Sequence, residues 1–338
     1  MKTYQQLWQS LTPLYDAGEA QAIVRTVLDV KYGMTLTDII CGKVNELSAD
    51  EERKLEEIII RLQKGEPVQY VLGEADFAGK TFHVEPGVLI PRPETAELCQ
   101  WIEEDFAGKS TDSSENSLED SSEDSLEDSL KDSLKDSSED SLEDSSPVTD
   151  NAKQILDICT GSGCIAITLG LNIPNSEVTG WDISEDALRI ARGNVEMLKA
   201  KNVRIEYQDA LALRKAANAT EISDSKPDSS LSKDWDIIVS NPPYICEKEK
   251  ADMDKNVLEH EPAIALFVPD EDPLKFYRAI AEYASSALKP EGALYFEINP
   301  IYEKETQKML QELGFKDIEI KEDAFGKKRM MKAKNNKE

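Results

Sequence analysis

Asn241, Pro242, Pro243 and Tyr244 follow directly after the apolar run 235–240. Such a run is typical of a buried parallel strand, and prolines end it because they cannot donate ladder hydrogen bonds. In open α/β sheets, ligands bind at the carboxyl ends of the strands. The Asn241 side-chain oxygen and the Pro242 carbonyl would then be two acceptors that face one point. This pair suits a substrate –NH2 group, because it holds both hydrogens and leaves the nitrogen lone pair free to attack.

Tyr244 completes this motif, and two further groups are candidates for the same cleft. We expect the Tyr244 ring to stack on a flat substrate group, since planar amides and bases both suit an aromatic face. Glu297 also ends an expected strand, where it either lines the cleft or forms a buried paired carboxylate. His260 has no second histidine nearby, so we interpret it as a structural or surface residue.

A second group of polar and small residues follows the strand expected at 154–158. The turn that contains Gly161 and Gly163 would let a ligand approach the backbone closely, next to a helix N-terminus. G-x-G alone is a weak signal, and the turn is neither a full G-x-G-x-x-G nor a phosphate-binding G-K-[ST] loop. Asp182 ends the next strand and could accept ribose hydroxyls or cap a helix. Asp209, after the third strand, could meet an adenine amino group or serve as a turn carboxylate.

The elements that must position these groups follow from the hydrophobic periodicity. Residues 1–75 are expected to be helical, and Ser48 and Glu51 form a capping box in them. Residues 76–109 suggest a hairpin linker and a helix, and strands alternate with helices over residues 151–338. This pattern predicts an α/β fold, a doubly wound Rossmann-like sheet with a small N-terminal helical bundle and a hairpin linker.

Residues 110–150 differ from the rest of the chain. Seven tandem tetrapeptides of the form S-[LS]-[EK]-D run from Ser117 to Asp144, and the segment contains 15 acidic residues and two lysines. Serine-rich acidic repeats cannot bury enough apolar surface to fold, so we predict a disordered insert. We assign it no chemistry.

Composition narrows the class of protein. The 338 residues carry a formal net charge of -28, which disfavours a grip on long nucleic acids, because phosphate contacts need basic residues. No apolar run of about 18 residues is present, and the N-terminus lacks an apolar signal core. Five scattered cysteines indicate reduced thiols and a cytoplasmic protein. Two histidines leave little material for a histidine metal site.

With D-x-x-T-G-S-G at 157–163, Asp182 and the motif at 241–244, the sequence resembles S-adenosylmethionine-dependent methyltransferases. It is most similar to the release factor glutamine methyltransferase family, which modifies the glutamine of the Gly-Gly-Gln loop of peptide chain release factors. The stretches 65–70 and 88–95 also match this family. The resemblance implies S-adenosylmethionine as cofactor, release factors as protein substrate, and a helical N-terminal domain that helps to recognise them.

The resemblance also implies roles for individual residues. The cofactor would be bound by Cys159, Thr160, Gly161, Ser162 and Gly163 in the loop, by Asp182 at the ribose, by Asp209 and Ala210 at adenine, and by Asn241. The substrate amide would be held by Asn241 and Pro242, with Pro243 and Tyr244 beside it. Two substitutions depart from the family pattern: Cys159 replaces a more usual glycine, and Asn299 stands where a glycine often follows the pair Glu297-Ile298. The insert at 110–150 is also not part of that pattern.

Three alternatives remain open at this stage. The first is a glutamine methyltransferase of a large-subunit ribosomal protein, which the stretch Pro91 to Glu94 disfavours. The second is a nucleic-acid methyltransferase acting on adenine N6 or guanine N2, which the acidic balance disfavours. The third is a non-catalytic nucleoside-binding protein, which the intact motif at 241–244 disfavours. We expect no membrane partner and no direct nucleic-acid substrate.

Overall fold

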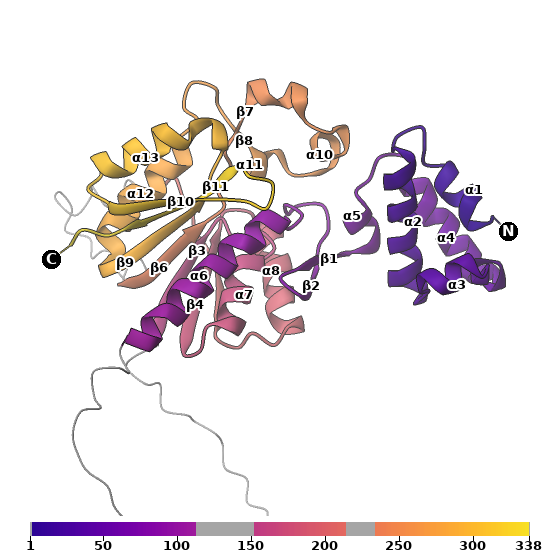
Figure 1. Cartoon of the computed structure of the whole chain (residues 1–338), viewed down its shortest axis with the longest axis horizontal. Coiled ribbons are helices and arrows are strands. Elements are labelled where there is room, and N and C mark those ends of the chain that lie inside the picture. Colours follow the sequence, from indigo (N-terminus) through magenta and orange to yellow (C-terminus); the bar gives the residue numbers. More distant parts are fainter. Residues whose placement is uncertain (1, 113–151, 214–233, 338) are drawn as a thin grey trace, which may run out of the picture.

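The computed structural model describes residues 2–112, 152–213 and 234–337. Figure 1 shows a helical part at the N-terminus, set to one side of a larger body that is built on a sheet. Of the predicted insert, only residues 110–112 are described, and they end a helix. The rest of that insert and residues 214–233 lie outside the described residues.

The helical part has a core of its own, which includes Leu11, Leu28 and Ile59. The predicted capping box is confirmed, since the Ser48 side chain and the Glu51 side chain each accept from the other residue's backbone N–H. This arrangement fixes the start of a helix whose apolar side packs inward. The elements are α1 (Tyr4–Gln9), α2 (Ala17–Tyr32), α3 (Leu36–Ile40), η1 (Lys43–Glu46), α4 (Ala49–Leu62) and α5 (Val68–Leu72).

A short hairpin and a long helix follow the helical part. The antiparallel strands β1 (Glu74–Phe77) and β2 (Lys80–His83) form the hairpin, and α6 (Pro93–Asp112) lies on the sheet (Figure 1). The first units of the larger body are β3 (Lys153–Ile158), α7 (Cys164–Asn172), β4 (Ser176–Asp182), α8 (Glu185–Met197), β5 (Val203–Tyr207) and β6 (Trp235–Ser240). The remainder comprises β7 (Ile245–Cys246), η2 (Glu247–Asp252), α10 (Lys255–His260), α11 (Ala263–Leu266), β8 (Phe267–Val268), α12 (Lys275–Ala287), β9 (Leu288–Glu297), η3 (Pro300–Tyr302), α13 (Glu303–Glu312), β10 (Lys316–Glu322) and β11 (Lys328–Lys334).

The central sheet confirms the predicted doubly wound fold. Its strand order is β10-β11-β9-β6-β3-β4-β5. The strands from β9 to β5 are parallel, and β10 and β11 add an antiparallel edge. After β3, the chain adds β4 and β5 toward one edge of the sheet. It then returns to β6, beside β3, and adds β9, β10 and β11 toward the other edge. The direction of winding therefore changes between β3 and β6, where ligands bind in folds of this kind.

Helices cover both faces of this sheet (Figure 1). Residues of α6, α7 and α8 share one hydrophobic cluster, and residues of α12 and α13 share another. Neighbouring residues of β3 point to opposite faces, so Ile155 belongs to the first cluster and Leu156 to the second. This burial on both faces is why β3 contains the consecutive apolar residues Ile155 and Leu156, followed by Ile158.

Gly180 lets the loop after β3 lie close against β4. A Cβ atom at this position would stand 2.8 Å from Thr160 Oγ1 and 2.9 Å from Ile205 Cδ1. The Thr160 backbone N–H donates to the Trp181 carbonyl at 2.9 Å, so the approach is also held by a hydrogen bond. The absent side chain is thus a condition for the loop's position.

We expect Gly180→Ala to lower the free energy of unfolding by about 1–3 kcal/mol, since the added methyl overpacks this contact. Gly193 in α8 is the matched control, because a Cβ there would meet nothing within 4 Å. Gly193→Ala should raise the stability by up to about 1 kcal/mol through its helix propensity. Urea unfolding of both variants measures the difference, and equal effects would contradict this account of the loop.

Candidate active site

The loop after β3 has a backbone that suits glycine at several positions. Gly161 and Gly163 have φ of 56° and 80°, and Cys159 has φ of 64° although it carries a side chain. The Gly161 N–H donates to Asp182 Oδ2 at 2.9 Å, which ties the loop to the end of β4. Nothing lies within 4 Å of the place where a Gly161 Cβ would stand. The loop therefore offers open backbone beside a carboxylate.

Asp182 is anchored by backbone donors and still borders a pocket. Besides Gly161, its carboxylate accepts from the Ser184 N–H at 2.9 Å. Ser184 caps α8 with its own hydroxyl, so the cap expected near this strand end is Ser184 and not Asp182. Burial raises the pKa of Asp182. Each carboxylate oxygen has a second lone pair, so Asp182 can accept from ligand hydroxyls as well.

Asp157 lies behind the loop and is fully buried. Its Oδ2 accepts from the Thr160 hydroxyl at 2.5 Å and from the Ala166 N–H at 3.1 Å. Its Oδ1 has no hydrogen-bond partner among the described residues. Burial raises the pKa of Asp157 to about 7. This carboxyl group therefore holds the loop and keeps one acceptor unused.

A first pocket of about 350 Å³ opens at the carboxyl ends of β3, β4 and β5, a volume within the range of small-molecule sites. Six of the residues predicted to bind the cofactor line it, namely Cys159, Gly161, Asp182, Asp209, Ala210 and Asn241. Thr160, Ser162 and Gly163 do not line it. Thr160 and Ser162 are buried and support the loop from behind, so direct contact of these three with a cofactor stays a prediction.

The lining of the first pocket fits a nucleoside that carries a positive charge. Asp182 and Asp209 supply carboxylates, and Ile183 and Phe276 supply apolar surface. Carboxylates suit ribose hydroxyls and an amino group, and apolar side chains suit the faces of a base.

A second pocket of about 830 Å³ adjoins the first. Asn241, Leu89 and Ala265 line both pockets, so Asn241 stands where they meet. Pro242 and Tyr244 line the second pocket, whereas Pro243 lines the first. Glu297 lines the second pocket as well, but His260 lines neither. The motif at 241–244 thus borders both pockets from the end of one strand.

A buried chain of hydrogen bonds runs behind Asn241. Its Nδ2 donates to Thr95 Oγ1 at 3.2 Å, and the Thr95 hydroxyl donates to Glu297 Oε2 at 2.6 Å. The Tyr244 hydroxyl donates to Glu297 Oε1 at 2.9 Å. Burial raises the pKa of Glu297, and these two hydrogen bonds oppose the rise. Both sequence alternatives for Glu297 therefore hold, since it borders the cleft and is also a buried, partnered carboxylate.

Asn299 holds the other side of the motif. Its Nδ2 donates to the Tyr244 carbonyl and to both oxygens of Glu249, each at 3.1 Å. The residue is buried and lines the second pocket. A glycine at this position could make none of these contacts.

The linker before α6 closes over both pockets. Val88 and Leu89 line the first pocket, and Leu89 also lines the second. Glu261 anchors this segment from below, because it accepts from the Ile90 N–H at 3.2 Å and pairs with Arg92. No site role was predicted for these residues from the sequence. The similarity of 88–95 to the family linker pointed to Val88, Leu89 and the residues that follow them.

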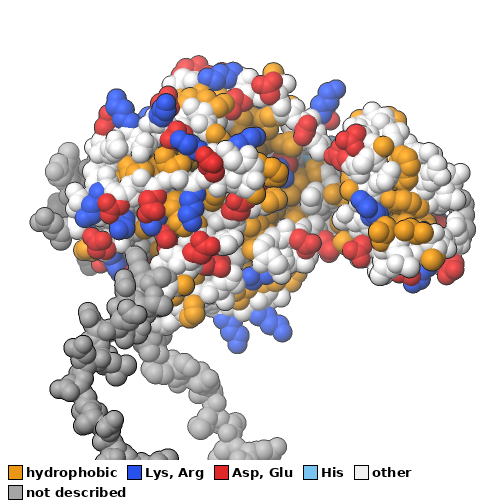
Figure 2. All heavy atoms as spheres, viewed as in Figure 1, with side chains coloured by type: hydrophobic (Ala, Val, Ile, Leu, Met, Phe, Trp, Pro, Cys, Tyr) orange, Lys and Arg blue, Asp and Glu red, His pale blue; other side chains and the backbone are white. Residues whose placement is uncertain are grey.

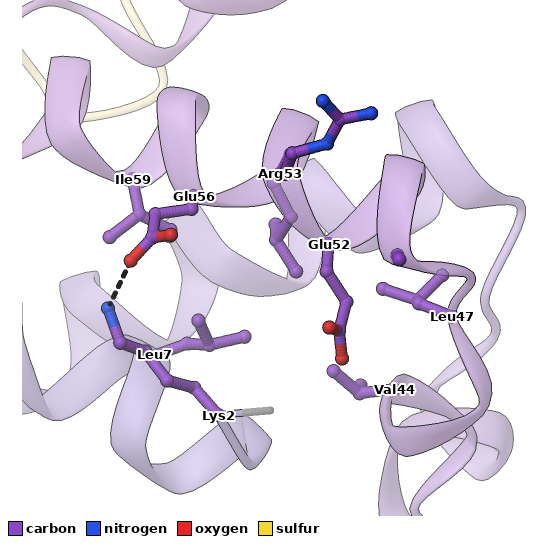
Figure 3. Close-up of a pocket in the computed structure, with 10 residues that line it drawn as sticks. Lys2, Leu7, Val44, Leu47, Glu52, Arg53, Glu56 and Ile59 are labelled. Atoms are coloured by element: carbon purple, nitrogen blue, oxygen red, sulfur yellow. Dashed lines mark hydrogen bonds and ion pairs between the residues drawn. The ribbon is translucent and has the colours of Figure 1, made fainter.

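Figure 2 shows the surface hollowed between the helical part and the larger body, with apolar side chains gathered along the hollow. A separate cavity of about 190 Å³ lies inside the helical part. Figure 3 shows it between Leu7, Val44 and Leu47, with the Lys2 and Glu56 ion pair at its side. None of the residues that we predicted to bind the cofactor or the substrate lines this cavity, so we do not include it in the active site.

Comparisons with known proteins agree with the geometry. Residues 12–73 match a family model described as PrmC N-terminal domain, and residues 149–332 match one described as methyltransferase domain. A release factor glutamine methyltransferase of Bacteroides thetaiotaomicron is 41% identical over 96% of each chain. The one from Flavobacterium psychrophilum is 36% identical over 98% of each chain. The one from Streptococcus pneumoniae is 35% identical over 88% of this chain and 86% of its own.

The chain belongs to the release factor glutamine methyltransferase family.

The resemblance inferred from the sequence motifs is thereby confirmed. In the part of the chain that the structure describes, no helix is both long and apolar enough to cross a bilayer.

The first prediction for this site concerns Asp157. In the folded protein its pKa is about 7, above the ordinary value of 3.8. The protonated carboxyl group therefore contributes to the free energy of unfolding at low pH, and this contribution is lost as the pH rises through about 7. Asp157→Asn keeps an acceptor for Thr160 and Ala166 but carries no charge. As the pH rises from about 4 to about 8, we expect the free energy of unfolding of Asp157→Asn to increase by up to about 4 kcal/mol relative to that of the wild type. Urea unfolding across this range measures the gain, and parallel curves would refute the shift.

The second prediction concerns Glu261. Glu261→Ala leaves the buried Ile90 N–H without an acceptor, which costs about 1–3 kcal/mol. Because the linker then loosens over the first pocket, we also expect the dissociation constant for S-adenosylmethionine to rise about tenfold. Glu259→Ala, at an exposed position on α10, is the control and should change neither quantity. Calorimetric titration measures both variants, and equal affinities would remove the anchoring role.

Proposed function

We propose that this protein transfers a methyl group from S-adenosylmethionine to the side-chain amide nitrogen of the glutamine in the Gly-Gly-Gln motif of peptide chain release factors. The position of Asn241 supports this proposal most directly, because it borders both a nucleoside-sized pocket and a larger open pocket. A methyl donor in the first pocket and a glutamine side chain in the second would meet at this residue. Family membership supplies the substrate class.

The mechanism depends on positioning rather than on an enzyme nucleophile. S-adenosylmethionine, when bound, supplies a sulfonium methyl group, and its carbon–sulfur bond breaks as the new carbon–nitrogen bond forms. Asn241 Oδ1 and the Pro242 carbonyl accept the two amide hydrogens of the substrate, which favours a pyramidal nitrogen with an available lone pair. The nitrogen releases its extra proton after transfer, so no strong base is needed. Holding the reactants in line supplies most of the acceleration.

The charged residues that line the second pocket favour a protein amide, and not a nucleic-acid base, as the group that receives the methyl. Glu249, Asp252 and Asp254 are acidic and line the second pocket together with the motif. A nucleic acid would bring phosphates next to these carboxylates, which is unfavourable. Arg92, Lys327 and Arg329 line the same pocket, and Arg92 is already paired with Glu261. We therefore propose no direct nucleic-acid substrate.

We further propose that residues 1–75 form a recognition domain for the release factor, with 76–109 as linker, 110–150 as insert and 151–338 as catalytic domain. The separate core of the helical part supports this division. Residues of the catalytic part lie close to it, since the place of a Gly65 Cβ is 4.0 Å from His260 Nε2. A substrate that acts in translation supports a cytoplasmic location.

The decisive experiment offers the protein labelled S-adenosylmethionine together with purified release factors, ribosomal proteins, RNA and DNA. We expect label only in release factors, and peptide mapping should locate it on the glutamine of the Gly-Gly-Gln motif. Label in a ribosomal protein or in a nucleic acid would replace the proposed substrate by one of the alternatives.

Asn241→Ala tests the acceptor pair. Loss of one of the two oriented acceptors should lower kcat about 10²- to 10³-fold, as the removal of one preorganised hydrogen-bonding group does elsewhere. The variant should keep the fold and bind S-adenosylmethionine, because the remaining lining of the first pocket is unchanged. Single-turnover methyl transfer, with calorimetry for the cofactor, separates the two effects. Normal turnover would refute the role of Asn241.

A further inference from the structure

We propose that Thr95 and Glu297 are positioning residues that determine which way the Asn241 amide faces, so that its oxygen and not its nitrogen points to the substrate. This inference rests on the proposed function and deepens it. The observation behind it is the directed chain of hydrogen bonds from Asn241 through Thr95 to Glu297.

The direction of the chain begins at Glu297. An ionised carboxylate can only accept hydrogen bonds. Its Oε2 accepts from Thr95 at 2.6 Å and its Oε1 from Tyr244 at 2.9 Å. Burial raises the pKa of Glu297, whereas these two hydroxyl donors and the charge of Arg329 favour its ionised form. Thr95 must therefore donate its single hydroxyl proton toward Glu297.

The same constraint then passes to Asn241. Once the Thr95 proton points to Glu297, the Thr95 oxygen can only accept from its other neighbour. Within the Asn241 amide, only Nδ2 can donate, and it lies 3.2 Å from Thr95 Oγ1. The opposite amide orientation would place two oxygens face to face with no proton between them. Oδ1 is thus left as the acceptor for a substrate –NH2 group.

Burial makes this constraint effective. Thr95 and Glu297 are each 2% exposed, so solvent is almost excluded from the side chains that set the direction. Thr95 lies in the first turn of α6, Glu297 ends β9 and Asn241 follows β6. Three elements far apart in the sequence therefore converge on one amide. An asparagine at the end of a strand without such partners would have no comparable preference between the two orientations of its side-chain amide.

The test uses Thr95→Val, which keeps the shape of the side chain but removes the hydroxyl. We expect kcat for release factor methylation to fall about 10- to 100-fold, with KM and the dissociation constant for S-adenosylmethionine within about threefold of wild type. Thr95→Ser restores the hydroxyl and should recover most of the activity. Glu297→Gln, whose amide can donate to Thr95, should lower kcat in the same way as Thr95→Val.

Thr168→Val is the matched control. Thr168 is as deeply buried, but its hydroxyl has no partner among the described residues, so its loss should leave kcat unchanged. A double-mutant cycle adds a second readout. If Thr95 acts through Asn241, then Thr95→Val should have little further effect in the Asn241→Ala background. Full activity of Thr95→Val, or additive losses in the cycle, would overturn the inference.

A readout without substrate separates this inference from the proposed function. In the free protein, the side-chain amide protons of Asn241 should exchange slowly with solvent, and Thr95→Val should accelerate that exchange. If wild-type protein methylates no release factor, the proposed function fails, and the exchange rates still decide the role of Thr95. Unchanged exchange in Thr95→Val would overturn the inference even in an active enzyme.

Discussion

The site depends on the way two neighbouring strands end together. The Ser240 hydroxyl, at the end of β6, donates to the Ile158 carbonyl at the end of β3 at 2.5 Å. The chain then leaves the two strands as two different loops, one rich in glycine and one with two prolines. Because the strands are parallel and joined at this point, both loops open from a single edge of the sheet. Every group in the proposed chemistry is placed relative to that edge.

Buried carboxyl groups are a second feature on which the site depends. Burial raises the pKa values of Asp157, Asp182 and Glu297, and each carboxyl group is fixed by donors from loops or side chains. A carboxylate that is costly to bury is retained where its direction or its charge is used. Asp157 and Asp182 hold the loop after β3, whereas Glu297 accepts hydrogen bonds from Thr95 and Tyr244 behind Asn241. At the first pocket itself, the carboxyl groups of Asp182 and Asp209 favour a cationic donor.

Much of this site could be predicted because its residues follow strands directly. Asp182 and Asn241 stand at strand ends, so hydrophobic runs alone place them at one edge of the sheet. Thr95 could not be found in this way, because it lies 202 residues from Glu297 and contacts it only after α6 docks on the sheet. The linker over the pockets depends similarly on Glu261, which is 171 residues from Ile90. Contacts of such separation leave no periodic signal in a sequence.

The two departures from the family pattern show how the loops tolerate substitution. Cys159 adopts a left-handed conformation that costs about 1–3 kcal/mol for a residue with a side chain. Two hydrogen bonds next to it, from the Thr160 and Gly161 N–H groups to β4, hold the loop regardless. Asn299 acts in the opposite sense, since it adds three hydrogen bonds that join the motif at 241–244 to η2. One departure thus introduces strain into a loop that β4 holds firmly, and the other reinforces the loop that carries the acceptors. Because both changes leave the ends of β3 and β6 in place, the geometry around Asn241 is preserved through them.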